Sequence, residues 1–143
     1  MVCLGNICRS PLAQGILQSK VNPNTVFVDS AGTAGYHTNK PPDPRSIEVA
    51  HTYGINISKQ RCRQFSRMDF EAFDIIYVMD KENYKNVLKM SRTKAEQNKV
   101  RLLLSEIDGR DNEVPDPYYG GKDGFEKVFK MIDHACEHIV KQL

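Results

Sequence analysis

Nine consecutive residues near the start of the chain combine a nucleophile with groups that bind an anion: Cys3-Leu4-Gly5-Asn6-Ile7-Cys8-Arg9-Ser10-Pro11. Gly5 and Asn6 tolerate left-handed backbone angles, so the loop can curl until successive amide groups point at one centre. The Arg9 guanidinium can bridge two oxygens of a phosphate, and the same positive groups favour the thiolate form of Cys3. A thiolate that faces a bound phosphoryl group can attack it. The motif therefore predicts a phosphate site with Cys3 as the nucleophile.

The helix that should follow this loop adds to the anion site. Ser10 is a good N-cap and Pro11 is a good first helical residue, and the positive end of the helix would face the phosphate. A structural cysteine is the alternative, because four cysteines give about a one-in-five chance of some Arg six positions downstream under ordinary residue usage. The Gly5-Asn6 pair and the Ser10-Pro11 helix start favour the phosphate site over this alternative.

A second candidate motif lies in the long loop expected over residues 105–121: Val114-Pro115-Asp116-Pro117-Tyr118-Tyr119-Gly120-Gly121. Splitting an aryl phosphate requires a proton on the leaving oxygen, and an Asp held between two prolines is a rigid general acid. Tyr118 and Tyr119 can form aromatic walls against a substrate ring. A Pro-Asp-Pro turn with surface tyrosines is the alternative. Together with the Cys3 loop, the motif predicts Asp116 as the general acid.

Apolar runs that predict strands alternate with periodic segments that predict helices. Strands are expected to end at Cys3 and to cover residues 26–28, 75–79 and 100–104. Helices are expected after the phosphate loop, from Asp43-Pro44 to Gly54, from Asp80 to Met90, and along a final apolar stripe from Phe125 to Val140. This order predicts an α/β fold, a single domain over residues 1–143, with a four-stranded parallel sheet, helices on both faces and the phosphate loop after the first strand. Because only Met1 and Val2 precede Cys3, we expect that first strand to be short or truncated.

Ligands of such sheets bind beyond the carboxyl ends of the strands. The Cys3 loop, Asp29-Ser30, Asp80 and the loop after Leu104 all follow predicted strands. We therefore expect these four segments to converge on one site.

Composition excludes several other classes of protein. The chain has 143 residues, 40% of them hydrophobic and 27% charged, with a formal net charge of +2. This charge is too small to indicate nucleic-acid binding, and no apolar run has the length of a membrane helix. The four cysteines match no zinc framework and favour a reducing compartment: Cys3, Cys8, Cys62 and Cys136. We expect a cytoplasmic monomer that binds no metal, no nucleic acid and no membrane.

The string CLGNICRSP resembles the active-site loop of the low-molecular-weight protein tyrosine phosphatases, and DPYYG is similar to their acid loop. The resemblance continues through VDSAGT, PPDPR and Met79-Asp80 to the C-terminal helix. It implies hydrolysis of protein phosphotyrosine and of small aryl phosphates through a phosphocysteine intermediate. It also implies that no metal or other cofactor takes part.

The same resemblance assigns roles to individual residues. The catalytic residues would be Cys3, Arg9 and Asp116. The phosphate and the substrate would be bound by Leu4, Gly5, Asn6, Ile7, Cys8, Ser10, Tyr36, Tyr118 and Tyr119. Supporting residues would be Ser30 and Asp80, with Ser10 and Ser30 holding Asn6 in its strained conformation and Ser10 assisting the thiolate.

Three features leave alternatives open. Relatives often carry a His after the serine that matches Ser58, whereas this chain has Lys59, so we expect rewiring around Asn6 or Asp80. A reversible bond between Cys3 and Cys8 could protect the nucleophile, or Cys8 could be a small buried filler. Three arginines could form a basic rim for acidic phosphopeptides or could be solvated charges: Arg61, Arg63 and Arg67.

Two related enzyme classes and one binding class compete with the phosphotyrosine assignment. Arsenate reductases resemble this chain but carry additional cysteines after the third strand, and residues 80–90 contain none here. Arginine phosphatases resemble it but have Thr where Ile7 stands and lack the paired tyrosines. A phosphotyrosine-binding pseudophosphatase would bind without turnover, but Cys3, Arg9 and Asp116 are all present.

Overall fold

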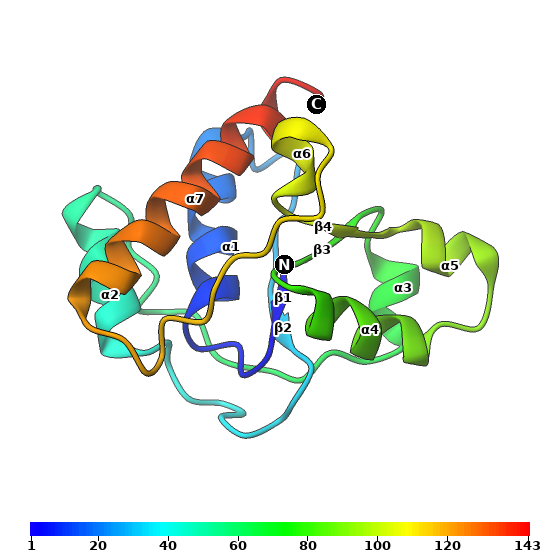
Figure 1. Ribbon diagram of the computed structural model, residues 1–143, viewed down its shortest axis with the longest axis horizontal. Coiled ribbons are helices and arrows are strands. Elements are labelled where there is room, and N and C mark those ends of the chain that lie inside the picture. Colours follow the sequence, from blue (N-terminus) through cyan, green and yellow to red (C-terminus); the bar gives the residue numbers. More distant parts are fainter.

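The computed structural model describes all residues, 1–143, and contains four short strands and seven helices (Figure 1). The strands are β1 (Val2–Cys3), β2 (Ala31–Gly32), β3 (Ile76–Val78) and β4 (Val100–Leu102). The helices are α1 (Arg9–Lys20), α2 (Pro44–Thr52), α3 (Met68–Ala72), α4 (Lys81–Met90), α5 (Lys94–Asn98), α6 (Ser105–Asp108) and α7 (Lys122–Val140).

The four strands form one parallel sheet in the order β2-β1-β3-β4. Val2 of β1 pairs with Ala31 of β2 on one side and with Val78 of β3 on the other. Val78 in turn pairs with Leu102 of β4. The predicted single-domain α/β fold with a four-stranded parallel sheet is therefore confirmed.

Side chains alternate between the two faces of the sheet, as the period of a β-strand requires. On one face Cys3, Met79 and Leu103 join a buried cluster with residues of α1, α2 and α7. On the other face Val2 and Val78 join a cluster with residues of α3 and α4. In Figure 1 these two groups of helices lie on opposite sides of the strands, so helices cover both faces as predicted.

The C-terminal helix is packed through the apolar stripe that the sequence predicts. Its buried residues are Phe125, Val128, Phe129, Ile132, Ala135, Cys136 and Ile139. The facing helix α1 buries Leu12, Ala13 and Ile16 completely. Burying an aliphatic or aromatic side chain of this size contributes roughly 1.5–3 kcal/mol. This helix pair therefore supports the phosphate loop that leads into α1.

Some predicted boundaries are wrong. The sequence predicts a strand over residues 26–28, but β2 is Ala31–Gly32, because these two residues pair with the two residues of β1. The sequence predicts Ser10 as an N-cap, but α1 begins at Arg9 after Cys8, and the Ser10 hydroxyl contacts other side chains instead. The short helices α3, α5 and α6 carry no clear periodic signal and were not predicted.

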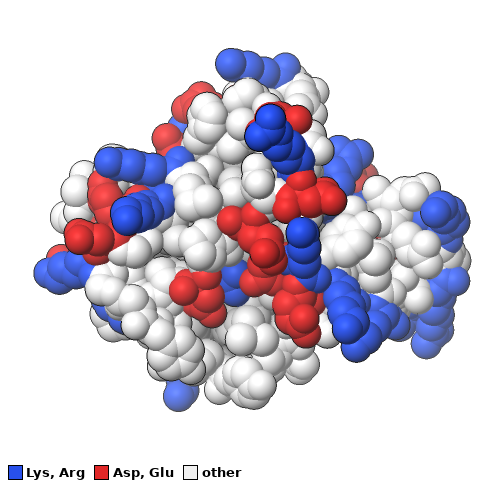
Figure 2. Space-filling model, viewed as in Figure 1, with Lys and Arg blue, Asp and Glu red and all other residues white.

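Figure 2 shows how charged side chains are distributed over one face of the molecule. Acidic side chains gather across the middle of this face, and Lys and Arg lie around them. None of the helices combines the length and the apolar character that crossing a membrane would require.

Candidate active site

A cleft of about 290 Å³ opens at the carboxyl end of β1, where the phosphate loop meets the loop before α7. It is lined by Cys3, Leu4, Gly5, Ile7, Cys8, Arg9, Tyr36, His37, Asp116, Tyr118 and Tyr119. Ten of these eleven residues belong to the set predicted from the sequence; His37 does not. Two loops more than 100 residues apart in the sequence thus face one cavity.

Of the two loop residues that tolerate left-handed backbone angles, Asn6 adopts such a conformation and Gly5 does not. Asn6 has a φ of 58°, and its side chain is 2% exposed. Gly32 of β2 lies directly against this loop, and a Cβ there would come within 2.8 Å of the Leu4 carbonyl oxygen and 3.0 Å of the Asn6 nitrogen. No larger residue fits at position 32 unless the loop moves.

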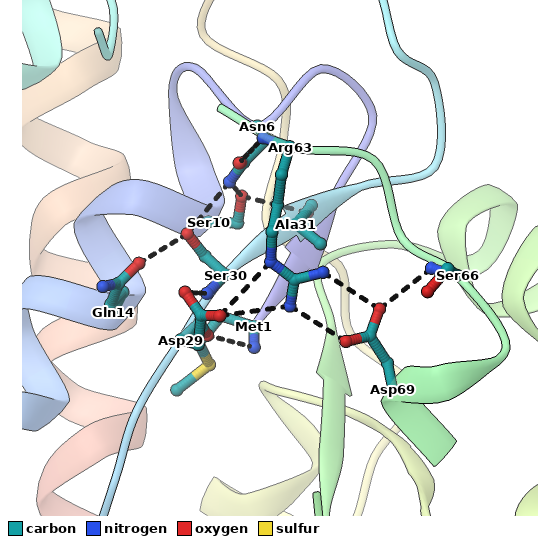
Figure 3. A network of polar contacts seen from close by, with 10 residues as sticks. All are labelled: Met1, Asn6, Ser10, Gln14, Asp29, Ser30, Ala31, Arg63, Ser66 and Asp69. Atoms are coloured by element: carbon teal, nitrogen blue, oxygen red, sulfur yellow. Dashed lines mark hydrogen bonds and ion pairs between the residues drawn. The ribbon is translucent and has the colours of Figure 1, made fainter. Parts of the chain in front are cut away.

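A chain of hydrogen bonds leads from Gln14 through Ser30 and Asn6 to Ser10 (Figure 3). Ser30 Oγ donates to Gln14 Oε1 at 2.6 Å, so it must accept the bond from Asn6 Nδ2 at 3.0 Å. The second proton of Asn6 Nδ2 goes to Ser10 Oγ at 2.7 Å. Ser10 Oγ lies 3.1 Å from Cys3 Sγ and 3.4 Å from the Ala31 carbonyl oxygen. Because Ser10 Oγ accepts from Asn6, its own proton goes to one of these two groups, and a thiolate at Cys3 is the closer acceptor. The predicted contacts of Asn6 with Ser10 and Ser30 are therefore present.

Arg63 and Cys62 hold Asn6 from the other side. The Arg63 amide donates to Asn6 Oδ1 at 3.0 Å, and Cys62 Sγ donates to the Asn6 carbonyl oxygen at 2.8 Å. The Arg63 guanidinium is fixed by ion pairs to Asp29 and Asp69 (Figure 3). Because Arg63 is committed to these contacts, it forms no basic rim.

The other residues of that segment also have local roles. Arg67 pairs with Glu96, and the Arg61 guanidinium donates to the carbonyl oxygens of Ser58 and Gln60. Lys59 is exposed, and the next side chain, Gln60, donates to the Pro11 carbonyl oxygen at 3.1 Å. Contacts to the loop and to α1 thus come from Gln60, Cys62 and Arg63, and none comes from Lys59.

Arg9 is the buried cation of the site, with a side chain that is 2% exposed. Its Nη1 donates to Asp80 Oδ2 at 2.6 Å and to the Val114 carbonyl oxygen at 3.0 Å. Burial disfavours the charge of Arg9, but the nearby negative groups of Cys3 and Asp80 outweigh it and raise the pKa of Arg9. The guanidinium is therefore held as a charged group that faces the cleft.

Asp116 lies above Arg9, with its carboxylate 3.6 Å from the guanidinium. Its Oδ1 accepts a hydrogen bond from the Tyr118 amide at 3.0 Å, and its side chain is 38% exposed. The start of its loop is anchored where the Val114 amide donates to the Met79 carbonyl oxygen at 2.8 Å. Asp116 is thus accessible from the cleft and forms an ion pair with Arg9.

Three tyrosines border the cleft. Tyr118 and Tyr119 meet edge to face, with ring centres 4.9 Å apart. Tyr118 is 39% exposed and Tyr119 is 94% exposed, and Tyr36, which also lines the cleft, is largely exposed. Aromatic walls of this kind suit a flat apolar ring that carries the phosphate.

All four cysteines are buried free thiols. Burial, with the charges of Asp43 and Cys3 as smaller causes, raises the pKa of Cys8 to about 12. Cys8 is therefore a protonated thiol at neutral pH, although it lines the same cleft as Cys3.

Sequence reasoning missed several residues that complete the site. His37 follows Tyr36 directly, and that proximity in the sequence was the only signal that could have indicated it. Gln14 could have been found from its place one helical turn after Ser10, on the same side of α1. Nothing in the sequence indicates that Arg63 would reach Asn6, because that contact joins residues far apart in the chain.

Comparisons with known proteins agree with this geometry. A model of the family described as "Low molecular weight phosphotyrosine protein phosphatase" matches residues 1–143. A low molecular weight protein-tyrosine-phosphatase of Streptomyces coelicolor is 38% identical over 94% of this chain and 85% of its own length. The low molecular weight protein-tyrosine-phosphatase YfkJ of Bacillus subtilis is 37% identical over 99% of this chain and 92% of its own length.

Solved structures with a similar fold include Vibrio vulnificus Wzb in complex with benzylphosphonate. That structure superposes with a TM-score of 0.89 and 30% sequence identity, covering 99% of this chain and 95% of the other.

Proposed function

The chain belongs to the low molecular weight phosphotyrosine protein phosphatase family, and we propose that Cys3, Arg9 and Asp116 carry out its reaction. The family removes phosphate from phosphotyrosine. The observation that carries the assignment is that a nucleophile, a buried cation and a carboxylic acid line one cleft bordered by tyrosines. Each of the three supplies a different part of phosphate ester hydrolysis.

In the first step the Cys3 thiolate attacks phosphorus, and the bond from phosphorus to the tyrosine oxygen breaks. Asp116 gives its proton to the departing oxygen, so tyrosine leaves as a neutral phenol. The Ser10 hydroxyl, 3.1 Å from Cys3 Sγ, stabilises the thiolate before the attack. The products of this step are the dephosphorylated tyrosine side chain and a phosphocysteine on Cys3.

In the second step water attacks the phosphocysteine, and the Asp116 carboxylate accepts the proton of that water. The phosphorus–sulfur bond breaks, Cys3 returns as a thiolate and inorganic phosphate leaves. Both steps build negative charge on the same phosphoryl oxygens. We assign the stabilisation of that charge to the Arg9 guanidinium and to the amides of the phosphate loop, because these residues line the cleft.

The rim of the cleft selects the substrate. Leu4 and Ile7 provide apolar contacts, and Tyr36, Tyr118 and Tyr119 provide aromatic ones. A phosphotyrosine ring can lie among these side chains while its phosphate reaches Cys3. Phosphotyrosine-bearing proteins and small aryl phosphates therefore fit this site, and the residues that line it require no metal or cofactor for the steps above.

We propose in addition that the protein acts as a monomer in the cytoplasm. One chain supplies every residue that lines the cleft, so a second copy is not needed to complete it. Four free thiols, one of them the nucleophile, suit a reducing compartment.

The test is hydrolysis of p-nitrophenyl phosphate and of a phosphotyrosine peptide in the presence of EDTA. Cys3→Ser should abolish turnover, and Asp116→Ala should lower kcat/KM for the peptide by about 10²–10⁴-fold, the usual share of a general acid. Cys136→Ala and Asp111→Ala are matched controls, because the first is in the core and the second is exposed in the same loop without a side-chain partner. A wild-type protein that binds the phosphopeptide but does not hydrolyse it would contradict the proposal.

A further inference from the structure

Arg45 is not among the residues that line the cleft, yet it contacts the loop that carries Asp116. Its guanidinium carbon lies 5.4 Å from the ring centre of Tyr118 and 4.6 Å from that of Phe125 in α7. Its Nη1 donates to the carbonyl oxygen of Gly120 at 3.4 Å. Tyr118 and Gly120 follow Asp116 by two and four residues, so Arg45 contacts the distal part of that loop.

A neighbouring carboxylate fixes the orientation of Arg45. Asp43 Oδ1 accepts a hydrogen bond from Arg45 Nε at 3.0 Å, and Asp43 Oδ2 accepts one from Arg45 Nη2 at 2.9 Å. The Arg45 amide donates to the same carboxylate at 2.8 Å, which makes Asp43 the N-cap of α2. Such a two-point contact with a planar guanidinium has a defined geometry that Lys could not reproduce.

The start of α2 is also attached to the phosphate loop. The Asp43 amide donates to the Ile7 carbonyl oxygen at 2.8 Å, and Ser46 Oγ donates to the Cys8 carbonyl oxygen at 3.2 Å. The Asp43–Arg45 pair therefore connects the backbone of the phosphate loop with the loop of the general acid.

The acid loop has few other attachments. Only two residues outside the loop, Arg9 and Arg45, form hydrogen bonds, ion pairs or cation–π contacts with residues 115–120. Arg9 holds the Asp116 carboxylate itself, and Arg45 holds the residues that follow it. Without Arg45 the part of the loop after Asp116 would lose its polar contacts with the scaffold.

We propose that Arg45 is a positioning residue for the general acid, which holds the Tyr118–Gly120 end of the acid loop against α2 so that Asp116 reaches the leaving oxygen. The inference rests on the proposed function, in which Asp116 protonates that oxygen. Displacing a reacting group by about 1 Å can cost up to about 10²-fold in rate, so loss of this contact should be measurable. The loss should concern the proton transfer and leave phosphate binding by Arg9 and the loop amides intact.

Two substrates with different leaving groups separate these effects. Phenyl phosphate releases a phenol that resembles tyrosine, whose pKa is about 10, and it needs a proton as it leaves. p-Nitrophenyl phosphate releases a stabilised anion that depends much less on the acid. Arg45→Ala should lower kcat/KM by about tenfold or more for phenyl phosphate and by less than about threefold for p-nitrophenyl phosphate. Arg45→Lys, which keeps the charge but loses the two-point contact, should fall between wild type and Arg45→Ala.

A double-mutant cycle tests whether Arg45 acts through Asp116. In an Asp116→Asn background, Arg45→Ala should cause no further loss with phenyl phosphate, because the group that it positions can no longer donate a proton. Arg92→Ala is the matched control, because Arg92 is exposed and its side chain has no hydrogen-bond or ion-pair partner. Urea denaturation of each variant establishes that it is folded under the assay conditions.

The outcomes distinguish this inference from the proposed function. Equal losses for both substrates, or losses from Arg45→Ala and Asp116→Asn that multiply in the double variant, would overturn the positioning role and leave the function standing. An Asp116→Asn variant as active as wild type on phenyl phosphate would instead overturn the general-acid assignment.

Discussion

The carboxylate of Asp80 lies 2.6 Å from the guanidinium of Arg9, and its other oxygen accepts a hydrogen bond from the Asn83 amide at 2.8 Å. One side chain therefore caps α4 and orients the cation of the phosphate site. Because Arg9 is almost completely buried, its position depends on this contact and on the Val114 carbonyl oxygen.

Asp80→Asn should weaken the phosphate site while it keeps the helix cap. Asn is as good an N-cap as Asp, but it removes the negative partner of Arg9. We expect kcat/KM for p-nitrophenyl phosphate to fall about 10- to 100-fold, since a hydrogen bond to a charged group contributes about 1.5–3 kcal/mol. Inhibition by inorganic phosphate should weaken in parallel. An Asn variant that binds phosphate as tightly as wild type would show that Asp80 serves only as a helix cap.

Substitutions of Asn6 should separate its backbone conformation from its side-chain contacts. Because the backbone of Asn6 has a φ of 58°, Asn6→Ala introduces strain of about 1–2 kcal/mol, whereas Asn6→Gly does not. Both variants lose the amide that orients Ser10 toward Cys3. We expect Asn6→Gly to be more stable than Asn6→Ala in urea denaturation, while kcat for p-nitrophenyl phosphate falls about tenfold or more in both. Wild-type activity in Asn6→Gly would show that only the backbone conformation matters.

Alkylation should distinguish Cys3 from the cysteines whose thiols stay protonated. Burial raises the pKa of Cys8 and of Cys136 to about 12, so both remain protonated and unreactive at neutral pH. Iodoacetamide at pH 8 should therefore modify Cys3, with mass spectrometry showing no adduct on Cys8. Inorganic phosphate should protect Cys3, and urea-unfolded protein should be modified at all four cysteines. Modification of Cys8 in the folded protein at pH 8 would contradict this prediction.

The Asp43–Arg45 pair should contribute stability that depends on pH. Hydrogen bonds from the Arg45 side chain hold the pKa of Asp43 below its ordinary value of 3.8, although burial opposes them. A carboxyl group whose pKa is lowered in the folded state stabilises that state above its ordinary pKa, and this contribution is lost as the pH falls through the folded-state pKa. The free energy of unfolding of wild type should therefore exceed that of Asp43→Asn at pH 7, and this difference should shrink as the pH falls below 3.8.

The control for this experiment is Asp111→Asn, which changes an exposed Asp that has no side-chain partner. Its free energy of unfolding, measured by urea denaturation, should differ little from that of wild type at every pH. If the difference in free energy of unfolding between wild type and Asp43→Asn did not change with pH, the Asp43–Arg45 ion pair would not be the cause of that difference.

Much of the fold could be predicted because its signals are local. The α7 stripe, the α4 cap at Asp80 and the α2 start at Asp43-Pro44 were all predicted from short segments, and the structure confirms them. The predicted position of the second strand was wrong. The register with the neighbouring strand decides which residues of an extended segment enter a sheet. The apolar residues 26–28 carry no information about that register.

The sequence by itself determined the two loops of the site, because each is a run of residues whose types already restrict the backbone and the chemistry. Only the tertiary structure decided which distant groups hold those loops in place. Asp80 binds the guanidinium of Arg9, and the backbone of Arg63 binds the side chain of Asn6. The Asp43–Arg45 pair connects the phosphate loop with the acid loop. The physical reason is that residue type and spacing set local backbone preferences. A hydrogen bond between residues far apart in the chain depends on how the whole sheet and its helices pack.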